Sequence, residues 1–205
     1  MTQNNDLKDI FYKIEEGTVL AFYQKSFWKQ IIPFFTREKK NEEVPQHVGI
    51  CFDIERNYKD LASFKFSDQS FHGGRFRKIC ITKFIDENNQ EIFFADEIYF
   101  MKQDKIKTFV LKNKLTEGQK IVGIKDAVFQ IGKKYGYNRL LFGIEFLEKI
   151  LPAEFQRKLF LRLNKKEAQR VCSTHVQYNL RIMGVIDKMD TFLTPLEITK
   201  LDIFK

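Results

Sequence analysis

The sequence contains few residues that interrupt or cross-link a chain. Its 205 residues include four prolines and three cysteines, and no two cysteines have CxxC spacing. The odd cysteine count argues against a disulfide framework, and the missing CxxC pair argues against a zinc ribbon. No apolar run approaches the roughly 18 residues of a membrane span. The first ten residues are polar and lack the basic start and apolar stretch of a secretory signal, so we expect no signal peptide.

The composition is that of one folded domain. Hydrophobic residues make up 43% and charged residues 30% of the chain, which is typical of globular proteins and not of disordered ones. At roughly 150 residues per domain, we expect a single domain over residues 1–205, with its core from about residue 14 to 204. The net charge of +8 favours anionic partners. An anionic polymer or a membrane surface fits this charge, and nucleic acid is less favoured.

The first half of the chain has the pattern of an antiparallel β meander. Six segments combine β-branched and aromatic residues with alternating polarity: 17–23, 47–53, 61–66, 75–84, 92–101 and 105–111. In the second segment, Val48, Ile50 and Phe52 share one face, while His47 and Cys51 lie on the other. The aromatic stretch 27–35 predicts a short helical turn that is broken at its proline.

The second half has helical patterns. Thr116 and Gln119 form a capping box ahead of apolar residues at helical spacing up to residue 131. Residues 142–163 are mostly helical in pattern, a last helix runs to Met183 with Gly184 as its cap, and 194–204 suit a turn and a short edge element. Strands followed by helices indicate an α+β fold, with a barrel-like antiparallel sheet packed against helices.

Two side chains suggest thiol chemistry. His47 begins a predicted strand, and Cys172 lies in the distant segment Val-Cys-Ser-Thr-His-Val. One cysteine and one histidine are the minimum for an activated thiolate nucleophile. The thiolate needs a lowered pKa, which a helix N-terminus and a neighbouring imidazolium both provide. Either residue alone is more often structural, because free cysteines are commonly small buried hydrophobic residues.

Several motifs in order along the chain resemble one family. Residues 45–50, Pro-Gln-His-Val-Gly-Ile, resemble the "HvGI" strand of the circularly permuted papain-like, NlpC-type (YiiX-like) cysteine amidases and peptidases. Residues 172–184 resemble that family's "CSxLVxxxLxxxG" helix. Residues 16–20, 132–135 and 194–204 resemble its opening strand, its "GxxY" element and its closing tail. The resemblance implies the permuted papain-like fold, in which histidine precedes cysteine, and it implies no metal or organic cofactor.

The resemblance also implies roles for individual residues. Cys172 would be the nucleophile and His47 the general base, with a third residue orienting the imidazole. The family offers a glutamate there. Here Asp68 is the best carboxylate by its distance to the Gly73–Gly74 turn, and Ser67 and Gln69 are alternatives. Two further side chains, Tyr135 and Tyr137, would line the substrate cleft or pack in the core.

Two local questions follow from the same region. His175 occupies a position where the family has leucine, so we expect it at the surface or behind the reacting groups. Asn164 and Glu167 form a second capping box, which predicts one helix from about 165 to 183 with Cys172 in its middle. The resemblance instead predicts a break near Arg170 and a helix that begins at Cys172. We adopt the second boundary, because a mid-helix thiol has no reason to ionise.

The sequence therefore predicts a cysteine amidase or peptidase that cleaves an amide bond, for instance in a cell-wall peptide, through a thioester. One alternative is a lipid acyltransferase or thioesterase-like enzyme on the same fold, with the aromatic stretch 27–35 at the membrane interface. Another is a non-enzymatic structural or binding component, for example of a phage particle. The expected location is cytoplasmic, or virion-associated and delivered by lysis. The oligomeric state is left open.

Overall fold

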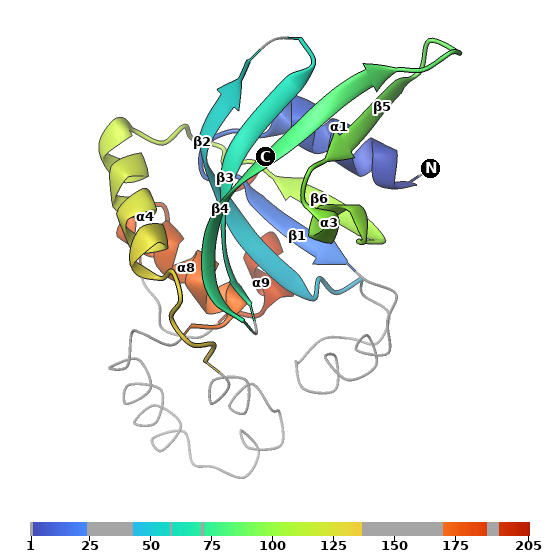
Figure 1. Ribbon diagram of the computed structural model, residues 1–205. Helices are drawn as coiled ribbons and strands as arrows, with labels where there is room; N and C mark the ends of the chain where they lie inside the picture. Colours follow the sequence, from blue (N-terminus) through green and yellow to red (C-terminus); the bar gives the residue numbers. More distant parts are fainter. Residues whose placement is uncertain (1, 24–42, 58, 71, 137–169, 188–192) are drawn as a thin grey trace, which may run out of the picture.

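The computed structural model describes residues 2–23, 43–57, 59–70, 72–136, 170–187 and 193–205 (Figure 1). The described strands are β1 (Val19–Tyr23), β2 (His47–Arg56), β3 (Leu61–Ser70), β4 (Gly73–Ile85), β5 (Glu91–Ala95) and β6 (Lys105–Phe109). The described helices are α1 (Thr2–Lys13), α3 (Ile98–Met101), α4 (Glu117–Phe129), α8 (Cys172–Ile182) and α9 (Pro195–Thr199). Four sequence predictions lie outside these residues: the aromatic stretch 27–35, the helical region 142–163, the capping box at 164–167, and the cleft role of Tyr137.

One antiparallel sheet of six strands organises the molecule. Its strand order is β5-β4-β3-β2-β1-β6, so β1 to β5 form a meander as predicted. The last predicted strand of the meander, β6, pairs with β1 and not with β5. The sheet curls into a half-barrel, and five described helices accompany it. The α+β class and the antiparallel, barrel-like sheet are therefore confirmed. Within this sheet β2, β3 and β4 are direct neighbours, which matters for the site described below.

Each face of the sheet has its own apolar core. Val48, Ile50 and Phe52 of β2 pack with α4, α8 and α9 on one face. Cys51 faces the other side, where it joins residues of α1 and α3 in the second core. The alternation predicted for residues 47–53 is thus confirmed. Each fully buried apolar side chain of this size contributes about 1.5–3 kcal/mol, so the two cores fix the strand register.

An amino-terminal helix, α1, was not predicted and closes the half-barrel. Its apolar residues recur at helical spacing, and Leu7 and Ile10 are fully buried. The core therefore begins earlier than the expected boundary at about residue 14. The Asn4 side chain bonds the Glu91 carbonyl (2.9 Å) and the Phe93 N–H (2.7 Å) at the edge of β5.

Two residues further along the same helix, an acidic side chain accepts a hydrogen bond from an amide of the other sheet edge. The Ile106 N–H of β6 donates to Asp6 Oδ2 at 2.7 Å. Unpaired edge amides are sites for pairing with other chains, and here polar side chains of one helix occupy amides of both edges. Helix α1 thus contacts both edge strands and lies on the concave face of the sheet.

The segment 92–101 is shorter as a strand than predicted. β5 ends at Ala95, and Ile98–Met101 form the short helix α3. The turn is held by Asp96, whose N–H donates to the Cys80 carbonyl (3.0 Å) and whose carboxylate accepts from the Cys80 N–H (2.9 Å). The helical turn buries Phe100 in the core while Tyr99 packs against His47.

Helix α4 begins at the predicted capping box. The Gln119 N–H donates to Thr116 Oγ1 at 3.3 Å, and the Thr116 N–H donates to Gln119 Oε1 at 2.9 Å. The helix ends at Phe129, two residues earlier than its apolar pattern suggests. A glycine, Gly123, lets α4 lie close against α8. A Cβ at this position would come within 2.6 Å of the Met183 sulfur at the end of α8.

Helix α8 begins at Cys172, as the resemblance predicts. The preceding Val171 is extended (φ −95°, ψ 168°), and its N–H donates to Thr174 Oγ1 at 3.0 Å. At the other end Gly184 has φ +67°, and the Val185 N–H donates to the Leu180 carbonyl at 2.8 Å. This is the bonding of a Schellman cap, which favours glycine because only glycine takes a positive φ without strain.

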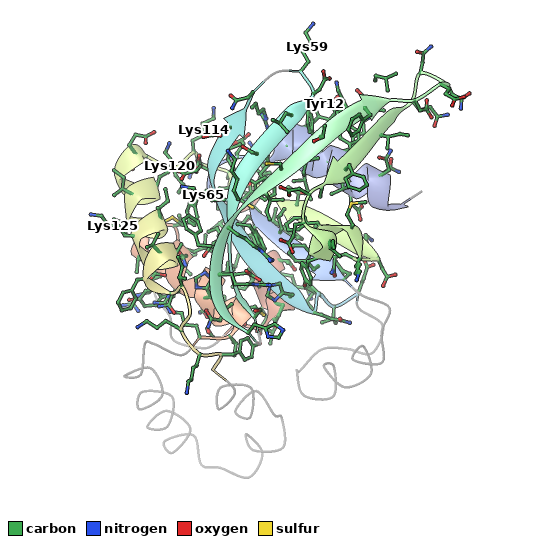
Figure 2. The ribbon with its side chains drawn as sticks, in the orientation of Figure 1. Tyr12, Lys59, Lys65, Lys114, Lys120 and Lys125 are labelled. Carbon is green, nitrogen blue, oxygen red and sulfur yellow. The ribbon has the colours of Figure 1, made fainter. Side chains whose placement is uncertain are left out.

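Positive charge is spread over the outer surface. Figure 2 shows Lys120 and Lys125 projecting from α4, with Lys65 on β3 nearby. Two of these are ion-paired, Lys65 with Asp53 at 2.8 Å and Lys120 with Glu117. Among the described helices, none has the length and apolar character that crossing a membrane requires.

Candidate catalytic site

Three elements bring the predicted triad together. His47 is the first residue of β2, Asp68 lies near the end of the neighbouring strand β3, and Cys172 is the first residue of α8. In Figure 1, α8 lies against the sheet where β2 and β3 run side by side. Cys172 packs in the core between α8 and the sheet and is 5% exposed. Residues more than a hundred positions apart thus share one site.

The hydrogen bonds join the three side chains in one row. His47 Nε2 donates to Asp68 Oδ2 at 2.8 Å. His47 is also hydrogen-bonded to the Cys172 thiol. Because Nε2 is engaged by the carboxylate, Nδ1 is the ring nitrogen available to the sulfur. A nucleophile, a base and an orienting carboxylate in this sequence form the arrangement that activates a thiol.

The position of Cys172 favours the thiolate. Burial alone would raise the pKa of the thiol, but the hydrogen bond and charge of His47 outweigh it. Backbone N–H groups of Val48 and Ser173 also donate to the sulfur, so that together these contacts lower the Cys172 pKa below its ordinary value. The Ser173 N–H is free to do so because first-turn amides of a helix have no intrahelical acceptor. Val48 lies just before the first residue of β2 that pairs with β3, Gly49, so no residue of β3 is paired with Val48.

The imidazole is stabilised as a cation. Burial alone would lower the pKa of His47, whose side chain is 13% exposed. The hydrogen bonds and negative charges of Asp68 and Cys172 together raise that pKa to about 9. The raised pKa of His47 and the lowered pKa of Cys172 both favour an imidazolium beside a thiolate, the pairing of other activated cysteines.

Asp68 is fully buried yet ionised. Burial would raise its pKa, but His47 and Arg75 together hold it at about 2. Arg75 Nε donates to Asp68 Oδ1 at 3.1 Å, and its Nη2 donates to Oδ2. Such a two-point contact fixes the plane of the carboxylate and keeps a lone pair of Oδ2 directed at the His47 imidazole.

Aromatic side chains hold the imidazole ring from the side. The ring centroid of Phe22 lies 5.8 Å and that of Tyr99 5.9 Å from that of His47, the latter edge-on at 86°. Burial, and then the negative charges of Asp68 and Cys172, raise the Tyr99 pKa above its ordinary range. Tyr99 thus remains a neutral phenol beside the site.

The two other candidates for the third residue point elsewhere. Ser67 Oγ lies 2.8 Å from His175 Nε2 on the opposite face of β3. Gln69 Nε2 donates to the Lys133 carbonyl at 2.8 Å. Of the three neighbouring residues, Asp68 is the one that contacts His47. The alternation along β3 explains this, since residues 67 and 69 face away from residue 68.

His175 was expected either at the surface or behind the reacting groups, and the structure places it behind them. Its side chain is fully buried one turn after Cys172 and bonds Ser67 behind the reacting groups. Burial, and then the positive charge of Arg170, lower its pKa to about 4, so His175 is neutral at pH 7. Its Nδ1 has no hydrogen-bond partner among the described residues.

An ion pair anchors the start of α8 to α4. Arg170 donates through Nη1 and Nη2 to the two oxygens of Asp126, and its guanidinium stacks 3.7 Å from the centroid of the Tyr178 ring. Asn179 Nδ2 also bonds Asp126, at 3.1 Å. Both partners of the ion pair are nearly buried, so the residues just before Cys172 are held in place.

The backbone of Tyr135, a predicted cleft residue, lies beside the segment that leads into Cys172. It forms a parallel β-bridge with Arg170, and the Gly136 N–H donates to the Arg170 carbonyl at 3.0 Å. Contact of its ring with a substrate stays a prediction. Within the described residues, no cluster of three or more histidine, cysteine or acidic side chains is arranged to hold a metal ion.

Sequence reasoning missed Arg75 and Tyr99 as parts of the site. Arg75 is directly opposite Asp68 in the β3–β4 register, as Gly49 is on the other side. One sequence feature indicated Arg75: Asp68 and Arg75 lie on either side of the glycine turn, and a hairpin there would place the two opposite charges across from each other. Tyr99 was assigned to a strand, and only the change to a helical turn brings its ring to His47.

Comparisons with known proteins add no further identification. The chain matches no family model, and no curated protein or solved structure matches it significantly. The family resemblance therefore depends on the sequence motifs alone.

Proposed function

We propose that this protein is a cysteine amidase or peptidase of the circularly permuted papain-like, NlpC-type kind. The observation that carries the proposal is the hydrogen-bonded row Cys172–His47–Asp68, with the cysteine at the first position of a helix. The chain order supports the permuted fold, because the histidine strand precedes the cysteine helix and the two pack against each other.

The geometry suits acyl transfer through a thioester. The Cys172 sulfur attacks the carbonyl carbon, and the carbonyl π electrons move to oxygen. The His47 imidazolium gives its proton to the departing amine, so the C–N bond breaks and a thioester remains. His47 then takes a proton from water, and the resulting hydroxide adds to the thioester carbon. The C–S bond breaks, the carboxylic acid is released, and the Cys172 thiolate is left beside the His47 imidazolium.

The first turn of α8 also supports the transition state. The Cys172 N–H is a first-turn amide with no intrahelical acceptor, and it lies next to the carbon under attack. We assign it as a donor to the oxyanion, which is the position where a fixed N–H lowers the barrier most. Removal of one such donor typically reduces turnover on the order of 10²–10³-fold.

The substrate we propose is a peptide amide of the cell-wall type. The residues after the nucleophile follow the amidase pattern, and Val171 stands where lipid-processing relatives carry asparagine. The spread positive charge is compatible with an anionic wall polymer. The same charge suits an anionic membrane, so the experiment below has to separate the two.

Wild-type protein and Cys172→Ala are incubated with muropeptides and, separately, with phospholipid vesicles, and products are identified by mass spectrometry. We expect new amine termini from muropeptides with the wild type and none with Cys172→Ala. Cys80→Ala is the matched control, because it removes a partly exposed thiol of β4 that is no part of the row. It should keep wild-type turnover.

The other outcomes assign the other functions. Cys172-dependent release of fatty acid with intact muropeptides would replace the amidase by a lipid acyltransferase or thioesterase-like enzyme. If neither substrate changes and Cys172 is not acylated, the protein is a structural or binding component that keeps the fold without the chemistry.

A further inference from the structure

Three neighbouring strands place charged side chains on one face of the sheet. Gly49 of β2 is directly opposite Asp68 of β3, and Asp68 is directly opposite Arg75 of β4. Directly opposite residues in an antiparallel pair point to the same face, with Cβ atoms about 4.5–5.5 Å apart. His47 lies two residues before Gly49 and so shares this face, and Cys172 of α8 meets His47 at the start of β2. The row runs from Cys172 through His47 and Asp68 to Arg75.

One carboxylate oxygen is shared by two cations. Asp68 Oδ2 accepts from His47 Nε2 at 2.8 Å and from Arg75 Nη2, while Oδ1 accepts from Arg75 Nε at 3.1 Å. Asp68 is fully buried, whereas Arg75 is 29% exposed at its side chain. The contact with Arg75 is thus the point where the buried row approaches solvent.

The other ionisable groups around the site are neutral or already paired. Arg77, also on β4, pairs with Glu97 at 3.2 Å, and Arg170 pairs with Asp126. Tyr99 from α3 and His175 from α8 are uncharged at pH 7 for the reasons given above. Among the described residues, the net charge of the site is therefore set by the four residues that form the row, Cys172, His47, Asp68 and Arg75.

This net charge depends on Arg75. The thiolate, the imidazolium and the Asp68 carboxylate leave one net negative charge in a buried site. An uncompensated charge of this kind is strongly unfavourable away from water, and the thiol would take up a proton to remove it. With the guanidinium present, two positive and two negative charges alternate along the row and cancel.

We propose that Arg75 is a positioning residue of this site, which holds Asp68 by both oxygens and supplies the counter-charge that lets Cys172 exist as a thiolate. The inference rests on the proposed function, since it assigns a role in activating the same nucleophile. Arg75 acts through Asp68 and His47 and does not touch the reacting atoms.

The test measures the ionisation of Cys172 without any substrate. The rate of alkylation of Cys172 by iodoacetamide is followed by mass spectrometry from pH 4 to 10, and the midpoint of its rise reports thiolate formation. In Arg75→Gln the midpoint should move upward by about one pH unit, the lower end of what loss of a nearby opposite charge produces. Arg75→Lys keeps the charge without the fork, so its midpoint should stay within about 0.3 pH units of wild type.

A matched control removes the same charge from the same strand. Lys78 of β4 pairs with the exposed Glu55 at 3.0 Å and does not contact Asp68, so Lys78→Gln should leave the midpoint unchanged. Equal midpoints in Arg75→Gln and Lys78→Gln would overturn the proposal. If Arg75→Gln does not fold, a one-unit shift in Arg75→Lys overturns it, because the positive charge is still present.

Failure of the proposed function gives a different result. In that case wild-type Cys172 itself would ionise no lower than an ordinary thiol, at about pH 8.5. A low wild-type midpoint that does not respond to Arg75→Gln would reject the role of Arg75 alone.

Discussion

Acid should destabilise the protein through the buried imidazole of His175. The folded state keeps this side chain neutral with a pKa of about 4, whereas the ordinary value is 6.5. Between these pH values the unfolded chain binds one more proton than the folded one, so the free energy of unfolding falls as the pH falls. At 1.36 kcal/mol per pKa unit, the loss attributable to His175 between pH 6.5 and 4 is about 3 kcal/mol.

The other groups of the site leave this window clear. The pKa of His47 is raised, so its contribution to stability is complete below its ordinary value of 6.5 and is lost only as the pH rises through about 9. The pKa of Asp68 is lowered, so its contribution is present above its ordinary value of 3.8 and is lost as the pH falls toward about 2. A loss between pH 6.5 and 4 thus reports on His175 among the residues of this site.

The variant that tests this removes both partners of the buried hydrogen bond. His175→Leu with Ser67→Ala leaves no unpaired hydroxyl behind, and replacing both partners avoids the larger penalty of removing one. Urea unfolding followed by circular dichroism gives the free energy of unfolding at pH 6.5 and at pH 4. The drop between the two should be about 3 kcal/mol smaller in the double variant than in the wild type.

His72 provides the control histidine, because it is exposed. His72→Gln should keep the wild-type drop in full. Carboxylates that titrate in the same window contribute equally to all three proteins, so the comparison isolates the imidazole. If the double variant loses as much stability on acidification as the wild type, His175 is not held neutral in the folded state.

Three further predictions concern the site itself. At pH 7, limited iodoacetamide should label Cys172 before Cys80, whose pKa burial raises, and His47→Ala should slow labelling of Cys172 at least tenfold; preferential labelling of Cys80 would refute the nucleophile assignment. Turnover should fall as the pH rises through about 9, because the His47 imidazolium that protonates the leaving amine is lost; a pH–rate profile that is flat to pH 10.5 would contradict this. Gly49→Ala should destabilise the fold by about 1–3 kcal/mol, since a Cβ there would lie 2.2 Å from the Phe66 ring; thermal unfolding at wild-type temperature would show that the ring has room to move.

The parts of the fold that the sequence predicted are those with strong local signals. The capping box at Thr116 and the glycine after Met183 each specify a helix end through contacts within a few residues. The alternation of Val48, Ile50 and Phe52 likewise needs only the period of a strand. Such features depend on neighbours in the chain, so a single sequence is enough to predict them.

The boundary at Cys172 shows where local signals fail. The capping box at Asn164 and Glu167 argued for a longer helix, and the family motif argued for a start at Cys172. The described residues follow the motif, since Val171 is extended and bonded to Thr174. Because a new helix starts here, its first-turn N–H groups are available to the Cys172 sulfur. In a continuous helix these N–H groups would instead donate to carbonyls of the preceding turn.

Arg75 could not have been assigned from the sequence alone because its role depends on register. A shift of one residue between β3 and β4 would turn it to the other face, away from Asp68. The buried Phe64 and Phe66 of β3 decide that register through packing that no local pattern describes. Helix α1 was not predicted for a different reason: most of its residues are polar, and few apolar residues, such as Leu7 and Ile10, mark its buried side.

The way α1 bridges the two sheet edges has a consequence for the order of folding. Its bonds reach 87 residues along the chain to Glu91 and 100 residues to Ile106. A helix of twelve residues is marginal on its own in water, so α1 gains its stability only when both edges exist. During synthesis α1 must therefore wait until β6 has emerged. We expect its docking to be a late step that covers the amides of both sheet edges, which could otherwise pair with strands of other chains.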